Sequence, residues 1–256
     1  MKKFLRILLF NLKVETKFKV DYFFRLFMYC FHIVIFNELW DYLLKDKLVL
    51  GYDKKSIIWY IIIGEAIIYS MNRNFVKRSE IIKNGDIVNI LVKPINILEY
   101  LFIGEFTSVI NLNINLIFAF VFGVVYLGVP QISLVNIFLF VISVIISYFT
   151  ILFCQLLIGL LAFFFEDNDV FYLIISKAIL IVTMSPLDFF DGFVYKFLSV
   201  LPTTYIIYGP SKIFLNCDVN MAIKLIVIQL MEFLLLYSIV KITSMKGVEK
   251  INVNGG

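Results

Sequence analysis

Acidic, amide and hydroxyl side chains inside long apolar runs are the residues of this chain that could do chemistry. A charge at the centre of a bilayer costs about 2.5–3.5 kcal/mol on insertion scales, so it normally faces a partner or a water-filled space. Such residues could line a translocation path, or they could form hydrogen bonds between helices. Glu65, which lies near the middle of its run, could also carry a proton, and both interpretations stay open for it. The set consists of Glu65, Glu105, Ser108, Asn111, Asn113, Asn115, Gln155, Gln229 and Glu232.

The sequence motifs of common catalytic and nucleotide sites do not occur in this chain. It contains no GxxxxGK[ST] loop for phosphates, no GxSxG and no HExxH. His32 is the single histidine, and the three cysteines are scattered without a CxxC spacing, so no metal site or disulfide framework is indicated. We therefore expect a chain that is not an enzyme and that holds no cofactor or metal of its own.

The composition is that of a membrane protein. Hydrophobic residues make up 61% of the 256 residues, and the mean hydropathy is +0.94. Several apolar runs reach the roughly 20 residues that a bilayer-spanning helix needs, and they are continuous rather than alternating, which argues against a β-barrel. The net charge of +4 is modest, and we expect no nucleic-acid partner because no basic run is patterned for one.

These runs predict an all-α polytopic membrane protein, a single transmembrane domain over residues 1–256 with about six transmembrane helices. Residues 1–19 are basic on one face and apolar on the other, which predicts an N-terminal interfacial helix. Most Lys and Arg residues fall in segments that this topology places inside, so both termini are expected in the cytoplasm. The predicted spans are 20–44, 56–74, 97–128, 134–165, 170–185 and 219–242.

Residues 186–218, before the last span, are too apolar for a free loop and too broken for a simple helix. They hold three of the five prolines: Pro186, Pro202 and Pro210. Non-helical backbone at membrane depth must be covered by protein or face water. We expect short helices here that dip into the outer leaflet or lie on it, as a broken re-entrant outer segment.

Residues 77–96 form a polar segment between two apolar runs, and their basic side chains place it on the cytoplasmic side. Asn84-Gly85-Asp86 is a turn signal. Ile87, Ile90 and Leu91 then recur at helical spacing until Pro94 stops the helix. The segment predicts a short amphipathic helix that another protein could contact, the alternative being a connecting loop with a surface-bound helix.

Two longer motifs resemble those of a known family. They are the runs GDIVNILVKPIN, residues 85–96, and LPTTYIIYGP, residues 201–210. With the basic N-terminal helix and the order of spans, they resemble the permease subunits of bacterial type 2 ABC exporters. One branch has a G-x-I/L-D-x-x-L-x-K/R-P-like segment, matched here by Gly85, Ile87, Leu91, Lys93 and Pro94. Val88 and Asn89 stand where that branch often has an acidic residue, so the chain departs from the pattern there.

The resemblance implies a transport complex in the bacterial cytoplasmic membrane. Two permeases, identical or paralogous, would form a dimer among the membrane lipids, and a separate ATP-binding cassette ATPase would hold ATP and Mg. The cytoplasmic segment would be the coupling helix that receives the motion of the ATPase. Its residues would be Arg78, Ile82, Gly85, Asp86, Ile87, Ile90, Leu91, Lys93 and Pro94.

The resemblance also places the translocation path between the two permeases, lined mainly by the second and fifth spans. The residues implied for the path are Glu65, Tyr69, Asn72, Ser176 and Met184. Those implied for the outer re-entrant segment, which would close the path, are Pro186, Pro202, Tyr205 and Pro210. The family exports drugs, antimicrobial peptides, lipids and glycans, and an apolar path favours an amphiphilic substrate.

Two alternatives from other classes stay open at this point. The chain could be an ion-coupled secondary transporter that uses Glu65 as its protonatable group. It could also be a membrane protein that transports nothing, such as an assembly or immunity factor. The energy source of transport would distinguish an ion-coupled transporter from an ATP-driven exporter. The absence of any flux would indicate a protein that transports nothing.

Overall fold

The computed structural model describes residues 19–44, 48–69, 74–91, 101–102, 108–165, 168–201, 203–215 and 217–254. The described residues are almost entirely helical, and their one β-type pairing is an isolated bridge between Val49 and Tyr52. This confirms the all-α class for the described part. The predicted interfacial helix, residues 1–19, lies outside the described residues except at its last position.

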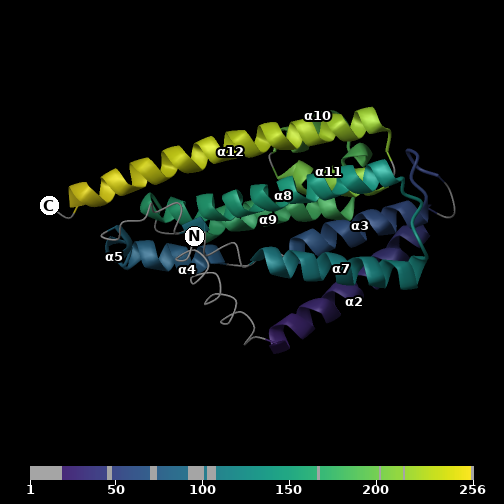
Figure 1. Ribbon diagram of the computed structural model, residues 1–256, viewed down its shortest axis with the longest axis horizontal. Coiled ribbons are helices and arrows are strands. Elements are labelled where there is room, and N and C mark those ends of the chain that lie inside the picture. Colours follow the sequence, from purple (N-terminus) through teal and green to yellow (C-terminus); the bar gives the residue numbers. More distant parts are fainter. Residues whose placement is uncertain are drawn as a thin grey trace.

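Three described helices are long and apolar enough to cross a membrane (Figure 1). They are α2 (Lys19–Leu44), α8 (Leu134–Leu160), which continues into the 3-10 turn η1 (Leu161–Phe163), and α12 (Val219–Asn254). At 36 residues, α12 is about 54 Å long, well beyond the roughly 30 Å of a bilayer core. The last span was expected to end at residue 242, where hydropathy falls, but the helix continues because its later turns pack against η1.

Three shorter helices occupy the remaining predicted spans. They are α3 (Lys54–Tyr69), α7 (Ser108–Leu127) and α9 (Asp169–Met184). A helix of 16 residues, such as α3 or α9, is about 24 Å long, which is shorter than the bilayer core. The six-span count therefore remains a prediction.

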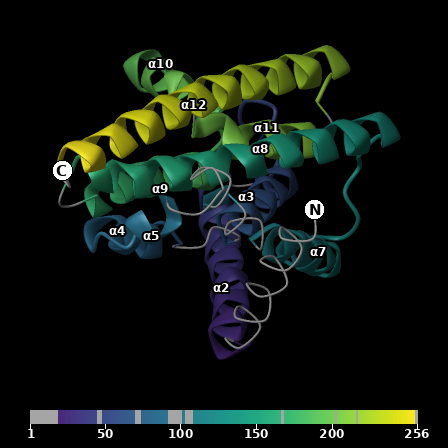
Figure 2. The same cartoon turned by 60° about the vertical axis from the view of Figure 1, so that its left-hand side comes forward.

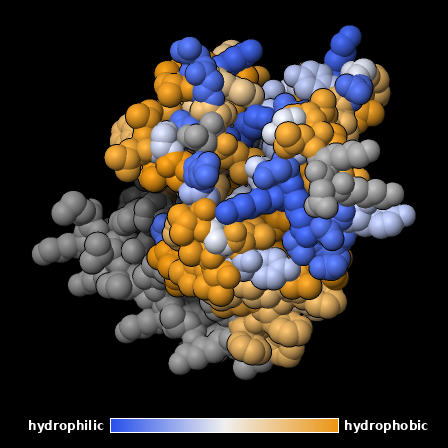
Figure 3. All heavy atoms as spheres, turned by 90° about the vertical axis from the view of Figure 1, so that its right-hand side faces the viewer, coloured by the Kyte–Doolittle hydropathy of each residue, from blue (hydrophilic) through white to orange (hydrophobic). Residues whose placement is uncertain are grey.

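Short helices gather at the two ends of the bundle (Figure 1). The α4–α5 end holds α4 (Asn74–Lys83) and α5 (Val88–Leu91). The α10 end holds the α2–α3 connection, the 3-10 turn η2 (Leu187–Phe189) and α10 (Gly192–Val200). Figure 3 looks onto the α10 end, where hydrophilic side chains gather among hydrophobic ones.

The centre of the molecule is formed by α3 and α11 (Thr204–Phe214). All residues of α3 from Ile57 to Ile67 are buried, and so are ten of the eleven residues of α11. Figure 2 shows α11 among the longer helices, and it packs on α3, α8, α9 and α12. The segment expected in the outer leaflet thus contains one largely exposed helix, α10, and one buried helix, α11, which Pro210 does not interrupt.

A polar network around Asp188 fixes the α10 end. The Tyr52 hydroxyl donates to one carboxylate oxygen of Asp188, and the Tyr208 hydroxyl donates to the other at 2.8 Å. Lys212 Nζ donates to the same carboxylate at 2.8 Å and to the Tyr52 hydroxyl at 2.6 Å. The network therefore ties the α2–α3 connection, η2 and α11 together.

The pKa of Asp188 reflects two opposing effects. Burial acts to raise it, but the hydrogen bond and charge of Lys212 and the hydroxyl donors outweigh burial, so the pKa lies below its usual value. Burial and the neighbouring Asp188 carboxylate both raise the pKa of Tyr52, which stays a neutral donor. The carboxylate form of Asp188 is therefore the form that the folded state prefers.

We expect Asp188→Asn to destabilise the protein by about 1.5–3 kcal/mol at pH 7, the range for hydrogen bonds to a charged group. Because the pKa of Asp188 is lowered on folding, its contribution is complete above the unfolded value of about 3.9 and is lost as pH falls through the folded value. Thermal unfolding in detergent should show a gap between the two proteins at pH 7 that closes below about pH 4. Asp191→Asn, an exposed carboxylate nearby, is the control, and an equal effect of both substitutions would contradict the network's role.

Candidate functional site

The predicted coupling segment is a helix, a tight turn and a second short helix. Gly85 has a φ of +78°, a left-handed conformation that glycine adopts without steric cost, and it ends α4. The Gly85 N–H donates to the Ile82 carbonyl at 3.2 Å, and the Val88 N–H donates to the Gly85 carbonyl at 3.1 Å. The turn predicted at Asn84-Gly85-Asp86 is therefore present.

The apolar side chains of this segment divide between the interior and the surface. Ile82 and Ile87 are buried, and they share a hydrophobic cluster with Leu156, Leu160, Phe163 and Val240. Both isoleucines were expected among the residues that receive an ATPase, but they face the chain's own α8 and α12. Amphipathic spacing identifies an apolar face without distinguishing a core from a partner surface.

The surface of the α4–α5 end is formed by other residues. Val88 is 49% exposed although it is a large apolar residue. The remaining exposed positions are Glu80, Lys83, Asn84, Gly85, Asp86 and Asn89. Among the predicted coupling residues, the side chains of Arg78, Ile90 and Leu91, and the whole of Lys93 and Pro94, lie outside the described part.

Glu65, the most central of the acidic residues, is buried against α2. Its carboxylate is 3.6 Å from Nδ1 of His32, and that nitrogen lies 3.2 Å from the Tyr69 hydroxyl. Glu65 is 2% exposed, so it lines no open surface of this chain. A partner within the fold favours the structural interpretation of Glu65.

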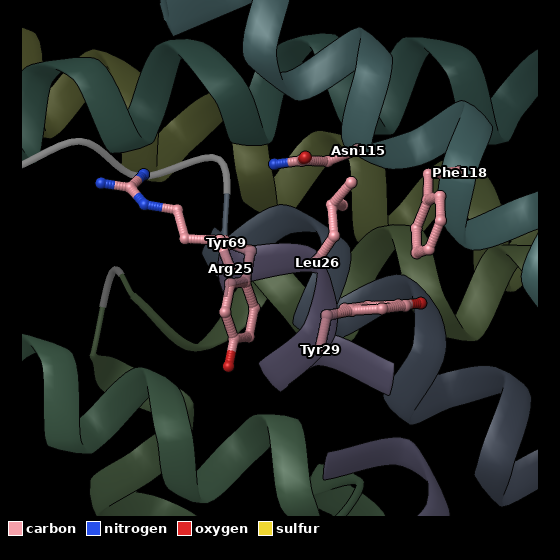
Figure 4. A pocket seen from close by; sticks show the side chains of 6 residues that line it. All are labelled: Arg25, Leu26, Tyr29, Tyr69, Asn115 and Phe118. Atoms are coloured by element: carbon pink, nitrogen blue, oxygen red, sulfur yellow. The ribbon is translucent and has the colours of Figure 1, made fainter. Parts of the chain in front are cut away.

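A small cleft of about 10 Å³ lies beside this pair, between α2, α3 and α7. Leu26 and Tyr29 of α2 face Asn115 and Phe118 of α7 across it, with Arg25 and Tyr69 to one side (Figure 4). The Tyr29 hydroxyl donates to the Ile62 carbonyl at 3.1 Å. The lining of the cleft is mainly apolar and aromatic, and the polar groups in this lining already have partners within the fold.

The path residues predicted on α9 have surroundings different from those of Glu65. The Ser176 hydroxyl donates to the Leu173 carbonyl of its own helix at 3.0 Å, and Met184 is 37% exposed. Large apolar side chains, including Leu173, Ile174 and Ile181, are exposed along the same helix. Glu65 and Tyr69 therefore face α2, while α9 presents a mainly apolar surface that includes the exposed Lys177; Asn72 lies outside the described residues.

Of the residues expected in the outer segment, Pro186, Tyr205 and Pro210 are buried, and Pro202 lies outside the described part. The Tyr205 carbonyl accepts a hydrogen bond at 2.9 Å from the side-chain amide of Gln229, which also contacts Ser143 and Ser147 on α8. This confirms the interhelical interpretation for Gln229. The side chains of Glu105, Ser108 and Asn111 lie outside the described part.

Sequence reasoning missed two polar groups that the fold brings together. One is the Asp188 network, for which the scarcity of charge between residues 186 and 218 was the available signal. The other is Asn168, whose amide contacts both α4 and α8. No group of three or more His, Cys, Asp or Glu residues that could hold a metal ion occurs among the described residues.

Comparison with known proteins identifies the family. Among curated proteins, none matches the sequence. The family model described as "ABC-2 family transporter protein" matches residues 22–255, nearly the whole chain. Together with the apolar helices described above, this match shows that the chain belongs to the ABC-2 transporter family and is a membrane-embedded permease component of an ABC transporter.

Proposed function

We propose that this chain is the permease half of an ATP-driven exporter of an amphiphilic substrate. Two copies, or one copy and a paralogue, would form the path in the bacterial cytoplasmic membrane, with both termini inside. A separate ATP-binding cassette subunit would hold ATP and Mg and supply the energy. The observation that carries this proposal concerns the α4–α5 end, one side of which is buried against the bundle while the other side is exposed.

One side of that end is fixed to the bundle. Ile82 and Ile87 are buried among residues of α8, η1 and α12. Such packing joins a surface helix rigidly to the long helices, because interiors are close-packed and transmit strain. A force applied to the α4–α5 end would therefore reach the transmembrane helices.

The other side is available to a partner. Val88 is exposed beside a turn that carries both charge signs, Lys83 and Asp86. An apolar residue surrounded by polar and charged ones resembles the centre and rim of a protein interface. This side is suited to bind the ATPase. Val88 also belongs to the run of residues 85–96, on which the family resemblance rests.

The apolar surface of α9 supports an amphiphilic substrate. Ile174, Ile181 and Met184 are exposed along this helix. A second permease against this face would enclose a mainly apolar path with one cationic side chain, the exposed Lys177, which suits amphiphilic drugs, antimicrobial peptides, lipids or glycolipids. Glu65 has a partner within the fold in His32, so its burial does not require that it carry protons.

The first test is affinity purification of the full chain from its native membrane in mild detergent, with mass spectrometry of the bound proteins. We expect a stoichiometric P-loop ATPase, and the same sample distinguishes a homodimer from a heterodimer. If the chain is recovered alone over a range of detergents, the proposal fails.

The exposed position Val88 provides a sharper test. Val88→Glu should remove most ATPase binding while leaving the permease inserted and folded, because the new charge lies at the partner surface. Interface hot spots cost about 2 kcal/mol or more when altered, or roughly 30-fold in affinity. The readouts are co-purification of the ATPase and the thermal midpoint of the permease.

Two variants control this prediction. Met245→Glu places the same charge at an exposed apolar position of α12 toward the same end, and it should leave the ATPase bound. Ile87→Glu places the charge in the core and should lower the thermal midpoint instead. Normal ATPase binding by a folded Val88→Glu protein would contradict the assigned surface.

The His32–Glu65 pair gives a prediction about energy coupling. Glu65→Gln should keep ATP-dependent transport, because a structural carboxylate is not required to carry protons. It should also lower the thermal midpoint, and His32→Gln combined with it should cost less than the sum of the two single changes, since paired residues are coupled energetically. The measurements are thermal unfolding of the three variants and efflux with and without a proton uncoupler; loss of all efflux in a stable Glu65→Gln protein would contradict the structural role.

A further inference from the structure

Asn168 lies where three segments of the α4–α5 end meet. It directly precedes α9, and its side chain is almost completely buried. The amide nitrogen donates to the Ser79 hydroxyl of α4 at 2.6 Å and to the Ile158 carbonyl of α8 at 2.8 Å. One amide group therefore connects α4 to α8 at the start of α9.

This side chain does not serve its own helix. An asparagine at the N-cap position usually accepts a hydrogen bond from the first turn of the helix that follows. Asn168 occupies that position before α9 but makes no such bond. Its amide is turned toward α4 and α8, so the contact between helices replaces the local cap.

Both partners of Asn168 are shielded from water. Ile158 is buried near the end of α8, just before η1. Ser79 is buried beside the hydrophobic cluster that holds Ile82 and Ile87. A hydrogen bond that is shielded from water here fixes direction as well as distance, which apolar packing alone does not do.

A displacement of α4 would be passed on to the helices against which α4 packs. Although α4 follows α3 along the chain, it packs on α8 and η1. We infer that Asn168 is a positioning residue for energy coupling: it holds α4 on the α8–α9 turn, so that a displacement of α4 moves α8 and α9 as one body. This inference rests on the proposed function, because the displacement would come from the ATPase.

The test measures movement at the far end of α9 without requiring a known substrate. A spin label is attached at Met184→Cys, an exposed position in the last turn of α9, in a protein whose three natural cysteines are replaced. The complex with its ATPase, in lipid discs, is compared with and without ATP and vanadate. In the parent complex the nucleotide should change the label's spectrum.

Ser79→Ala should shift the equilibrium constant of this nucleotide-dependent change by about fivefold, the factor that corresponds to one hydrogen bond of ordinary strength, and Asn168→Ala, which removes two hydrogen bonds, should shift it further. Ser79→Thr keeps the hydroxyl and should keep the response. ATPase binding and basal hydrolysis should stay at the parent level in all variants. If Asn168 had only a structural role, its substitution would lower the thermal midpoint of the protein. ATP hydrolysis and the movement of α9 would then stay coupled.

The possible outcomes separate the inference from the proposed function. If no ATPase is bound by the parent protein, the proposed function fails. If the ATPase binds but the label does not respond in the parent, or responds equally in Ser79→Ala, the coupling role of Asn168 is overturned and the permease function stands. Should Asn168→Ala fail to fold, Ser79→Ala compared with Ser79→Thr decides the question.

Discussion

Polar groups buried between helices are shielded from water, so the chain has to satisfy them with its own groups. Three interactions of this kind organise the structure. Gln229 joins α12 to α8 and α11, Glu65 joins α3 to α2 through His32, and Asn168 joins α4 to α8. In each case the polar group lies between helices rather than along an open channel, so it fixes which helices are neighbours where apolar packing alone would allow several arrangements.

The long helix α8 receives two of these interactions and connects the two ends of the molecule. Near its middle, Ser143 and Ser147 bind Gln229; near its end, the Ile158 carbonyl binds Asn168. The buried helix α11 packs on α8, where Phe214 contacts Phe140, and α4 packs on α8 near Leu156 and Leu160. Because a helix is stiff along its axis, a displacement at the α4–α5 end can reach α11 through α8 without passing through α3.

The sequence predicts the helices well because their apolar runs are long and uninterrupted, and the turn at Gly85 because few residues other than glycine adopt its backbone conformation. It does not predict the direction in which Ile87 points. A helix of four residues has too few positions for its pattern to separate a core from a partner surface, and most of the buried residues that share a cluster with Ile87 lie about 70 to 150 positions later in the chain.

Pairs that are distant in sequence explain the other differences. No local pattern marks Asp188 and Lys212 as partners, and only the fold of α11 brings them within 2.8 Å. Pro210 was expected to break its segment, yet α11 continues through it because ten of its eleven residues are held in the core. Local signals identify the elements, whereas burial by distant residues decides which of them enter the interior.

The filled interior also bears on where a substrate could pass. Eleven successive residues of α3 are buried, and α11 occupies the space beside them. The cleft at Arg25 has a volume of about 10 Å³, roughly the room that one water molecule needs, whereas pockets for drug-sized ligands hold about 300–1,000 Å³. An amphiphilic substrate of that size would not fit this cleft, while the apolar surface of α9 is long and exposed. A path between two permeases is therefore more consistent with this structure than a path through one.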